Sequence, residues 1–154
     1  MEDRCILISF KRLINTFSWL LWIAIGFNNV QAQTGAVLLK IQGIKVTKGG
    51  EVLAGLFKKE KFPHEGQQFM GQKSKVTDGT TDILFEQVPA GDYGVIAFQD
   101  IDKNNRLKKN LIGYPSEPVG FSNDAKIKLG PPSYEDAKVI VEAGKTLIVP
   151  IKLK

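Results

Sequence analysis

Oxygen-bearing side chains recur at every second position in residues 100–106, and this run is the part of the sequence best suited to chemistry. Asp100, Asp102 and Asn104 occupy the first, third and fifth positions, and Arg106 offers a backbone carbonyl at the seventh. A calcium-binding loop begins in this way, because alternate residues of a tight loop direct their oxygens at one centre and Ca²⁺ takes about six to eight oxygen ligands. Asn105 stands where an EF-hand needs Gly, and Asn tolerates the left-handed backbone better than most residues.

The twelfth position of this run departs from an EF-hand, because Leu111 stands where a bidentate Glu is needed. A carboxylate from elsewhere has to complete the site, and Glu117 and Asp124 are the nearest candidates. The alternative is an Asx-turn, in which Asp100 and Asn104 accept hydrogen bonds from their own backbone. The sequence leaves both interpretations open.

Catalytic chemistry has weaker support. His64 is the single imidazole, the chain contains no G-x-S-x-G elbow, and an exposed loop after Pro63 accounts for this histidine. A carboxylate pair such as Asp100 and Glu117 could serve a glycosidase, provided that the acids flank a cleft. We therefore favour a non-enzymatic binding or accessory module. A small secreted hydrolase that uses carboxylates of the flap defined below, or a structural surface or adhesion module, is the alternative.

The first 32 residues have the three parts of a secretory signal peptide. Arg4, Lys11 and Arg12 form a basic start, residues 13–27 are predominantly apolar, and Val30-Gln31-Ala32 is a small-residue exit site. The apolar stretch is shorter than the roughly 20 residues that span a bilayer. The sequence therefore predicts an exported protein, periplasmic or secreted, with no transmembrane segment after cleavage.

Exported protein is expected to begin at Gln33, because cleavage after a small residue at position 32 fits the exit site. Intact-mass measurement of the exported protein checks this start, including a form in which Gln33 has cyclised to pyroglutamate. A mass that retains Met1 to Ala32 would contradict the prediction.

Composition narrows the class of protein. The 154 residues are 43% hydrophobic and 24% charged, with a formal net charge of +5, which is ordinary for a globular domain. The single Cys, Cys5, lies within the predicted signal, so disulfide frameworks and Cys-based zinc sites are excluded. The basic residues are spread along the chain without an aromatic–basic motif, so we expect no nucleic-acid partner. We expect a monomer with an unidentified ligand or protein partner.

Apolar residues alternate over several short segments separated by Gly and Pro, and this pattern is typical of strands. Residues 33–154 are predicted to form an all-β domain, an antiparallel β-sandwich of Greek-key type with about seven strands. Pro150 predicts that the last strand lies at an edge, and two apolar faces predict that residues 93–98 form a central strand. The predicted core comprises Val37, Leu39, Ile41, Leu53, Phe57, Ile83, Phe85, Val95, Ala97, Val139, Val141, Leu147, Val149 and Ile151.

Residues 100–132, here called the flap, show little alternation, and such long loops are usually functional or disordered. Leu111 and Ile112 are among its apolar residues, so we expect an ordered flap that packs on itself and on the sandwich, and that forms the functional surface. Tyr114, Phe121 and Tyr134 either form a binding platform or plug one end of the sandwich, and we favour the plug. A single helical turn is predicted after Ser133, a good N-cap residue.

Several of these segments together resemble a bacterial family, domain of unknown function 2141. The resemblance covers roughly Gly35 to Leu153 and rests on Phe62-Pro63, Phe98 to Leu107, Leu111 to Glu117, Gly120-Phe121-Ser122-Asn123 and Gly130 to Tyr134. It implies an exported protein without an assigned activity. The family usually reads D-x-N-G-N-G-K-L-D from Asp100 onward, whereas this chain has Asp102, Lys103, Asn105 and Lys108 at the first Asn, the two Gly and the final Asp. Residues 85–93, F-x-x-V-P-x-G-x-Y, also resemble a strand–turn–strand of transthyretin-like sandwiches.

Overall fold

The computed structural model describes residues 33–154. The predicted signal peptide, residues 1–32, lies outside the described residues. Among residues 33–154, no helix combines the length and apolar character needed to cross a membrane.

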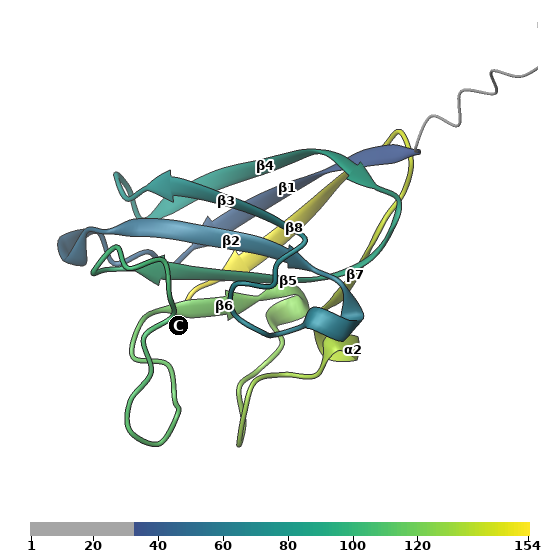
Figure 1. Ribbon diagram of the computed structural model, residues 1–154. Helices are drawn as coiled ribbons and strands as arrows, with labels where there is room; N and C mark the ends of the chain where they lie inside the picture. The colour runs from purple at the N-terminus through teal and green to yellow at the C-terminus, as the bar shows by residue number, and fades with distance from the viewer. Residues whose placement is uncertain (1–32) are drawn as a thin grey trace, which may run out of the picture. The chain divides into compact units, whose positions relative to one another are not determined.

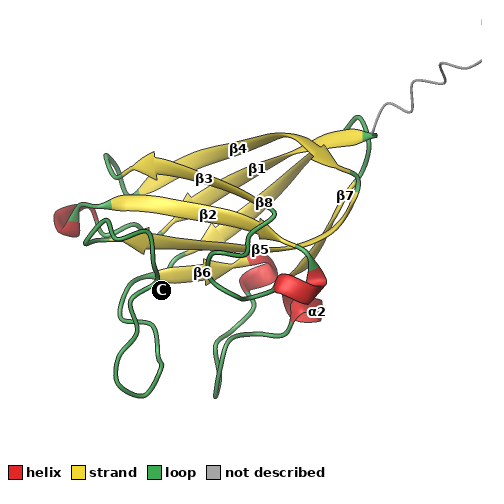
Figure 2. Cartoon of the chain, in the orientation of Figure 1, coloured by secondary structure: helices red, strands yellow, loops and turns green. Residues whose placement is uncertain are grey.

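Two sheets pack face to face, and Figures 1 and 2 show that helices contribute only short turns. The first sheet has the order β4 (Thr80–Pro89), β1 (Thr34–Gln42), β8 (Thr146–Lys152). The second has the order β3 (Met70–Lys75), β2 (Glu51–Phe57), β5 (Gly91–Asp100), β6 (Val119–Phe121), with β7 (Lys138–Val141) also paired to β5. The predicted all-β sandwich is therefore confirmed, with eight strands in the described part of the chain.

One strand pair departs from the predicted antiparallel arrangement. β1 and β8 run parallel, from Ala36 opposite Thr146 to Gln42 opposite Lys152. The two strands lie at opposite ends of the domain sequence, so no hairpin turn dictates their relative direction. β8 is an edge strand, as Pro150 predicts, because a strand bonded on one side accommodates a residue without an N–H.

The main core lies between the two sheets, and most of the predicted core residues are buried there. Val139 and Leu147 are partly buried against it. Leu53 and Phe57 are the exceptions, because β2 directs Val52, Ala54 and Leu56 inward and these two residues to the opposite face. Both faces of β2 are apolar, so alternation alone could not tell which set points into the sandwich.

A second apolar cluster covers the outer face of the second sheet. Its buried members are Phe57, Phe62, Val119, Phe121 and Ala137. Phe62 lies directly on Gly94 of β5, where a Cβ atom would come within 2.5 Å of the Phe62 ring. This part of the outer face is thus apolar and is covered by loops.

The alternation of apolar residues does not predict two of the strands. β3 has a polar sequence, MGQKSK, and β6 is only three residues long and lies inside the flap. By contrast, the predicted single helical turn is confirmed as α2 (Tyr134–Ala137), where the Ser133 side chain accepts a hydrogen bond from the backbone N–H of Asp136. The flap is therefore two loop arms on either side of β6.

Candidate functional site

Asp100, Asp102 and Glu117 form the acidic cluster of the flap. Each offers a carboxylate oxygen, and these oxygens lie within 4.8 Å of one another. Asp100 ends β5, and Glu117 comes just before β6. The two strands pair antiparallel with Phe98 opposite Val119, and extending this register sets Asp100 opposite Glu117. The strand pairing therefore brings the two acids together across a long separation in sequence.

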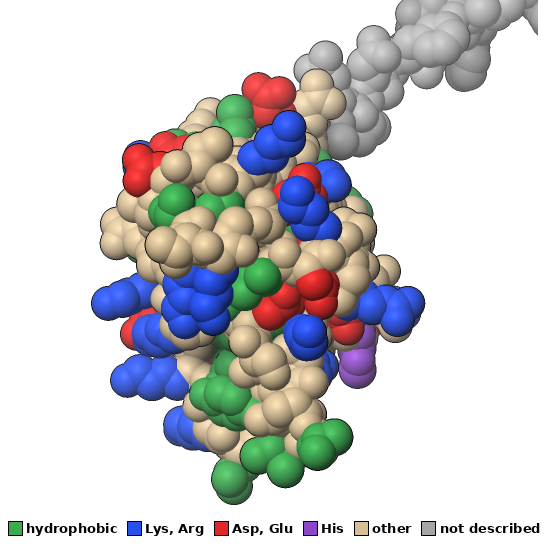
Figure 3. Space-filling view, turned by 90° about the vertical axis from the view of Figure 1, so that its left-hand side faces the viewer, with side chains coloured by type: hydrophobic (Ala, Val, Ile, Leu, Met, Phe, Trp, Pro, Cys, Tyr) green, Lys and Arg blue, Asp and Glu red, His purple; other side chains and the backbone are tan. Residues whose placement is uncertain are grey.

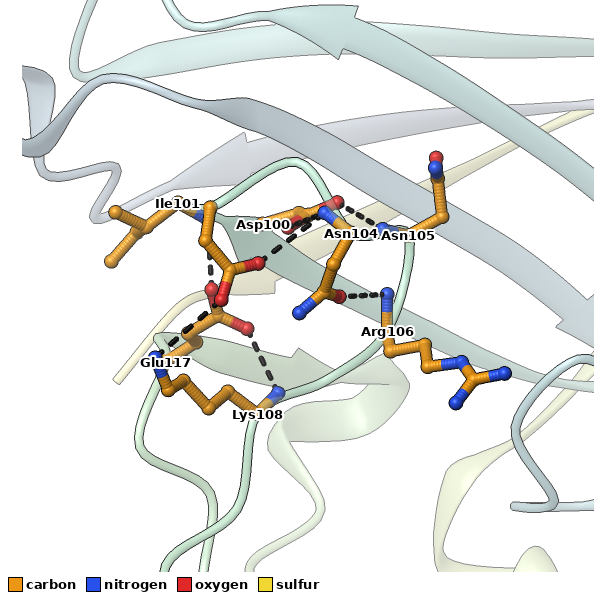
Figure 4. Close-up of polar contacts among 8 residues, drawn as sticks. Asp100, Ile101, Asn104, Asn105, Arg106, Lys108 and Glu117 are labelled. Atoms are coloured by element: carbon orange, nitrogen blue, oxygen red, sulfur yellow. Dashed lines mark hydrogen bonds and ion pairs between the residues drawn. The ribbon is translucent and has the colours of Figure 1, made fainter.

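Asp100 is fully buried, and both of its carboxylate oxygens accept backbone hydrogen bonds. One accepts from the N–H of Asn104 at 3.1 Å and the other from the N–H of Asn105 at 2.7 Å (Figure 4). A carboxylate oxygen has two lone pairs. Each oxygen of Asp100 therefore keeps one lone pair after this contact.

Glu117 is only 4% exposed and holds together the two ends of the tight loop that begins the first flap arm, residues 101–108. Its Oε1 accepts a hydrogen bond from the N–H of Ile101 at 2.8 Å, and its Oε2 accepts one from the N–H of Lys108 at 2.9 Å. Figure 4 shows both contacts beside those of Asp100. This carboxylate therefore closes the loop that follows β5.

Asp102 is the exposed member of the cluster. Its Oδ2 lies 3.5 Å from the Nζ atom of Lys108, the one ion pair that the cluster makes within residues 33–154. The three carboxylates of the cluster are therefore balanced by a single ammonium group, that of Lys108. Backbone N–H groups supply the remaining favourable contacts of the two buried acids.

The residues that follow Asp100 form a tight loop. Lys103 and Asn105 have φ values of 58° and 59°, in the left-handed region that favours Gly. The Oδ1 atom of Asn104 accepts a hydrogen bond from the N–H of Arg106 at 2.7 Å, and Asp102 accepts one from the N–H of Asn104 at 3.3 Å. The hydrogen bonds of an Asx-turn and the convergence of three carboxylates are both present.

The other candidate acid, Asp124, lies outside the acidic cluster. Its carboxylate forms an ion pair with Lys154, and the hydrogen bond from that ammonium group lowers the pKa of Asp124 below its usual value. Of the two candidates for the missing carboxylate, the fold thus brings Glu117 to the loop. His64 is exposed, in agreement with its interpretation as a loop residue.

A groove of about 540 Å³ lies beside this loop, on the outer face of the second sheet. Its floor is apolar and is made by Leu53, Phe57, Ile96 and Phe98. One wall comes from the loop of residues 63–68, and the other comes from the flap through Asn105, Leu107 and Lys109. This groove cannot be predicted from the sequence, because its floor depends on which face of β2 and β5 points outward.

The two walls of the groove contact each other at one point. The backbone N–H of Leu107 donates a hydrogen bond of 2.7 Å to the Oε1 atom of Glu65. Asn105, which also lines the groove, is held by Asp100. The position of this flap wall therefore depends directly on the acidic cluster.

The aromatic residues of this region divide between two roles. Phe121 is 6% exposed, and its ring centroid lies 6.4 Å from that of Phe62. Tyr134 packs edge-on against Phe62 at 5.8 Å. Phe121 is buried and Tyr134 is partly buried, so neither forms an open platform, but they cover the outer face of the second sheet rather than plug one end of the sandwich. Tyr114 is half exposed.

Comparison with known proteins identifies the family. No curated protein and no solved structure matches this sequence. The sequence matches a family described as an uncharacterised protein conserved in bacteria, DUF2141, over residues 27–149. This match spans most of the chain and includes the acidic cluster, both sheets and most of β8. The chain belongs to the DUF2141 family.

Proposed function

We propose that this chain is an exported, non-enzymatic binding module in which the acidic cluster takes up Ca²⁺ and thereby fixes one wall of the groove. The observation that carries the proposal is the convergence of the Asp100, Asp102 and Glu117 carboxylates within 4.8 Å, two of them buried. Oxygen ligands of this kind are those that Ca²⁺ prefers.

Electrostatics supports a cation at this point. Like charges that lie close together and are shielded from water repel one another more strongly than exposed ones. The backbone hydrogen bonds of Asp100 and Glu117 reduce this cost, and Lys108 balances one charge. A divalent ion would balance the two remaining charges and would use the lone pairs that the hydrogen bonds leave free.

The same contacts argue against the acids as a hydrolytic pair. A carboxyl group that transfers a proton to a substrate must present an oxygen to it. Asp100 and Glu117 are buried, neither lines the groove, and their carboxylates hold backbone N–H groups of the loop. Such contacts are those of groups that organise a loop, and they favour binding over catalysis.

Ligand binding is assigned to the groove because its floor is apolar and its flap wall is attached to the acidic cluster. Asn105 connects the two features through its hydrogen bond to Asp100, and Leu107 connects the flap wall to the opposite wall through Glu65. Ca²⁺ should therefore slow amide hydrogen exchange at Asn105 and Leu107, since it restrains the local opening that exchange requires. The ligand of the groove is expected to be partly apolar.

Ca²⁺ is expected to raise the melting temperature of residues 33–154. Without the bidentate Glu of an EF-hand, and with Lys103 and Arg106 nearby, we expect a Kd of about 10⁻⁴–10⁻³ M. At about 2 mM Ca²⁺ and a Kd of about 10⁻⁴ M, stabilisation is about 1.8 kcal/mol. That corresponds to a melting shift of roughly 5–10 °C for a domain of this size. Mg²⁺ should substitute poorly, because it requires a tighter octahedron and retains its waters.

Two variants of the cluster and one control sharpen this test. Asp102→Asn removes an exposed charge, so it should melt like the wild type in EDTA and lose most of the Ca²⁺ shift. Asp100→Asn should lose the shift and also melt lower in EDTA, because its amide would face a backbone N–H donor. Asp82→Asn, an exposed acid on β4, should keep the shift. Equal melting of the wild type in EDTA, Ca²⁺ and Mg²⁺ would mean that the loop is an Asx-turn only.

A further inference from the structure

The ends of the two flap arms carry the most exposed large apolar side chains of the described residues. Leu111 is 107% exposed, Ile112 is 87% exposed and Leu129 is 109% exposed. These positions contradict the expectation that Leu111 and Ile112 pack on the sandwich. We call residues 110–114 and 128–131 the two tips. Figure 1 shows both arms extending from the same side of the sandwich, beyond β6 and α2.

The first tip is a turn held by hydrogen bonds to Asn110. Asn110 accepts a backbone hydrogen bond from Gly113 at 2.9 Å, and its side chain accepts from Ile112 at 3.1 Å and from Tyr114 at 2.9 Å. The arm below the turn is closed by the hydrogen bond from Ser116 to the backbone of Lys108. The turn therefore holds its apolar side chains out into solvent.

The two tips border the same apolar hollow. A pocket of about 350 Å³ is lined by Ile112 and Tyr114 from the first tip and by Leu129 and Pro131 from the second. Half-exposed Tyr114 adds an aromatic ring with a polar end, a side chain suited to the boundary between water and lipid. Figure 3 shows hydrophobic side chains gathered at this end of the molecule.

Positive charge lies immediately behind the tips. Residues 105–131 contain Arg106, Lys108, Lys109, Lys126 and Lys128, against two acids. Of these acids, Glu117 is buried in the acidic cluster and Asp124 is paired with Lys154. In the described part of the chain, Lys109, Lys126 and Lys128 form no ion pair.

We propose that the two tips dock this domain on an anionic lipid bilayer, with Leu111, Ile112 and Leu129 in the interface and the lysines against the lipid headgroups. Exposed apolar side chains gain free energy by leaving water, and each lysine near an anionic surface adds to the attraction. A soluble anion would account for the lysines but not for the apolar tips. This proposal is independent of Ca²⁺ uptake by the acidic cluster.

The test measures the binding of residues 33–154 to lipid vesicles by co-sedimentation in EDTA. This part of the chain contains both apolar clusters described above, and its fold is checked by a thermal melt before vesicles are added. We expect binding to phosphatidylcholine vesicles that contain phosphatidylglycerol, and much weaker binding to phosphatidylcholine alone. Raising the salt from about 0.1 M to about 1 M should release the protein, because the Debye length falls from about 10 Å to about 3 Å.

Variants separate the apolar contribution from the charge. Leu111→Ser with Leu129→Ser should weaken binding more than about 10-fold, since each leucine loses interfacial burial. Ile112→Ser should weaken it, whereas Ile148→Ser, a matched change on exposed β8, should leave it unchanged. Lys128→Gln should cost about fivefold. Lys145→Gln, at the turn between β7 and β8, is its control.

Four outcomes would overturn the proposal. The first is an absence of binding to both vesicle types, and the second is wild-type binding by the double leucine variant. The third is a lipid-free dimer that the double leucine variant abolishes, since the tips would then cover each other in a second copy of this chain. Equal binding to both vesicle types would overturn the assignment to anionic lipid. Because the assay contains EDTA, its failure leaves the Ca²⁺ melting test unaffected.

Discussion

Phe121→Ala is expected to lower the free energy of unfolding by about 3–5 kcal/mol. The ring is 6% exposed and packs edge-on against Phe62 in the cluster on the outer face of the second sheet. Removing it leaves a cavity between β6, the loop that carries Phe62, and α2. Chemical denaturation monitored by circular dichroism measures the loss.

Phe69→Ala is the matched control for this variant, because it removes the same ring from a half-exposed site. Phe69 is 47% exposed and contacts Tyr93 with a centroid distance of 5.7 Å. Its loss should cost about 1 kcal/mol, the value of one aromatic contact. A loss below about 1 kcal/mol for Phe121→Ala, as for an ordinary surface position, would mean that the flap is not anchored through this ring.

Gly50→Ala is expected to destabilise the domain by about 2–5 kcal/mol and to abolish any Ca²⁺-dependent melting shift. Gly50 has a φ of 87°, and a Cβ atom there would lie 2.2 Å from the backbone oxygen of Asp100 and 2.8 Å from the Cα atom of Ile101. The left-handed backbone costs an L-residue about 1–2 kcal/mol, and overpacking adds about 1–3 kcal/mol. Because the clash falls on backbone atoms, the start of the acidic loop has to move.

Gly144→Ala separates the conformational cost from the clash. Gly144 also has a positive φ, 71°, but a Cβ atom there would meet nothing within 4 Å. It should therefore cost only about 1–2 kcal/mol and leave the response to Ca²⁺ intact. Denaturation and thermal melts of both variants, with and without Ca²⁺, make the comparison. Equal costs for the two variants would refute the close approach of Gly50 to Asp100.

Much of the fold can be read from local pattern. Alternation places most core residues, Pro150 identifies β8 as an edge strand, and Ser133 marks the start of α2. These features are local because side-chain direction in a strand has a period of two, and capping involves residues within one turn. The oxygen pattern that begins at Asp100 is local in the same sense.

The complete acidic cluster depends on residues that are far apart in the sequence. Glu117 joins Asp100 only because β6 pairs with β5, and β6 is three residues long in a segment without alternation. Its pairing is set by the burial of Val119 and Phe121 on the outer face of the second sheet. The sequence offers Glu117 and Asp124 as candidates, and strand register brings Glu117 to Asp100.

The sequence by itself therefore determines the sandwich, its edge strand and the oxygen-rich start of the flap. The tertiary structure decides the parallel pairing of β1 with β8, the outward direction of Leu53, and the exposure of Leu111 and Leu129. These features depend on which sheet edges and apolar faces other segments have already covered. An apolar side chain has the same local preference in either setting, and long-range packing alone decides whether it meets a core, a groove or solvent.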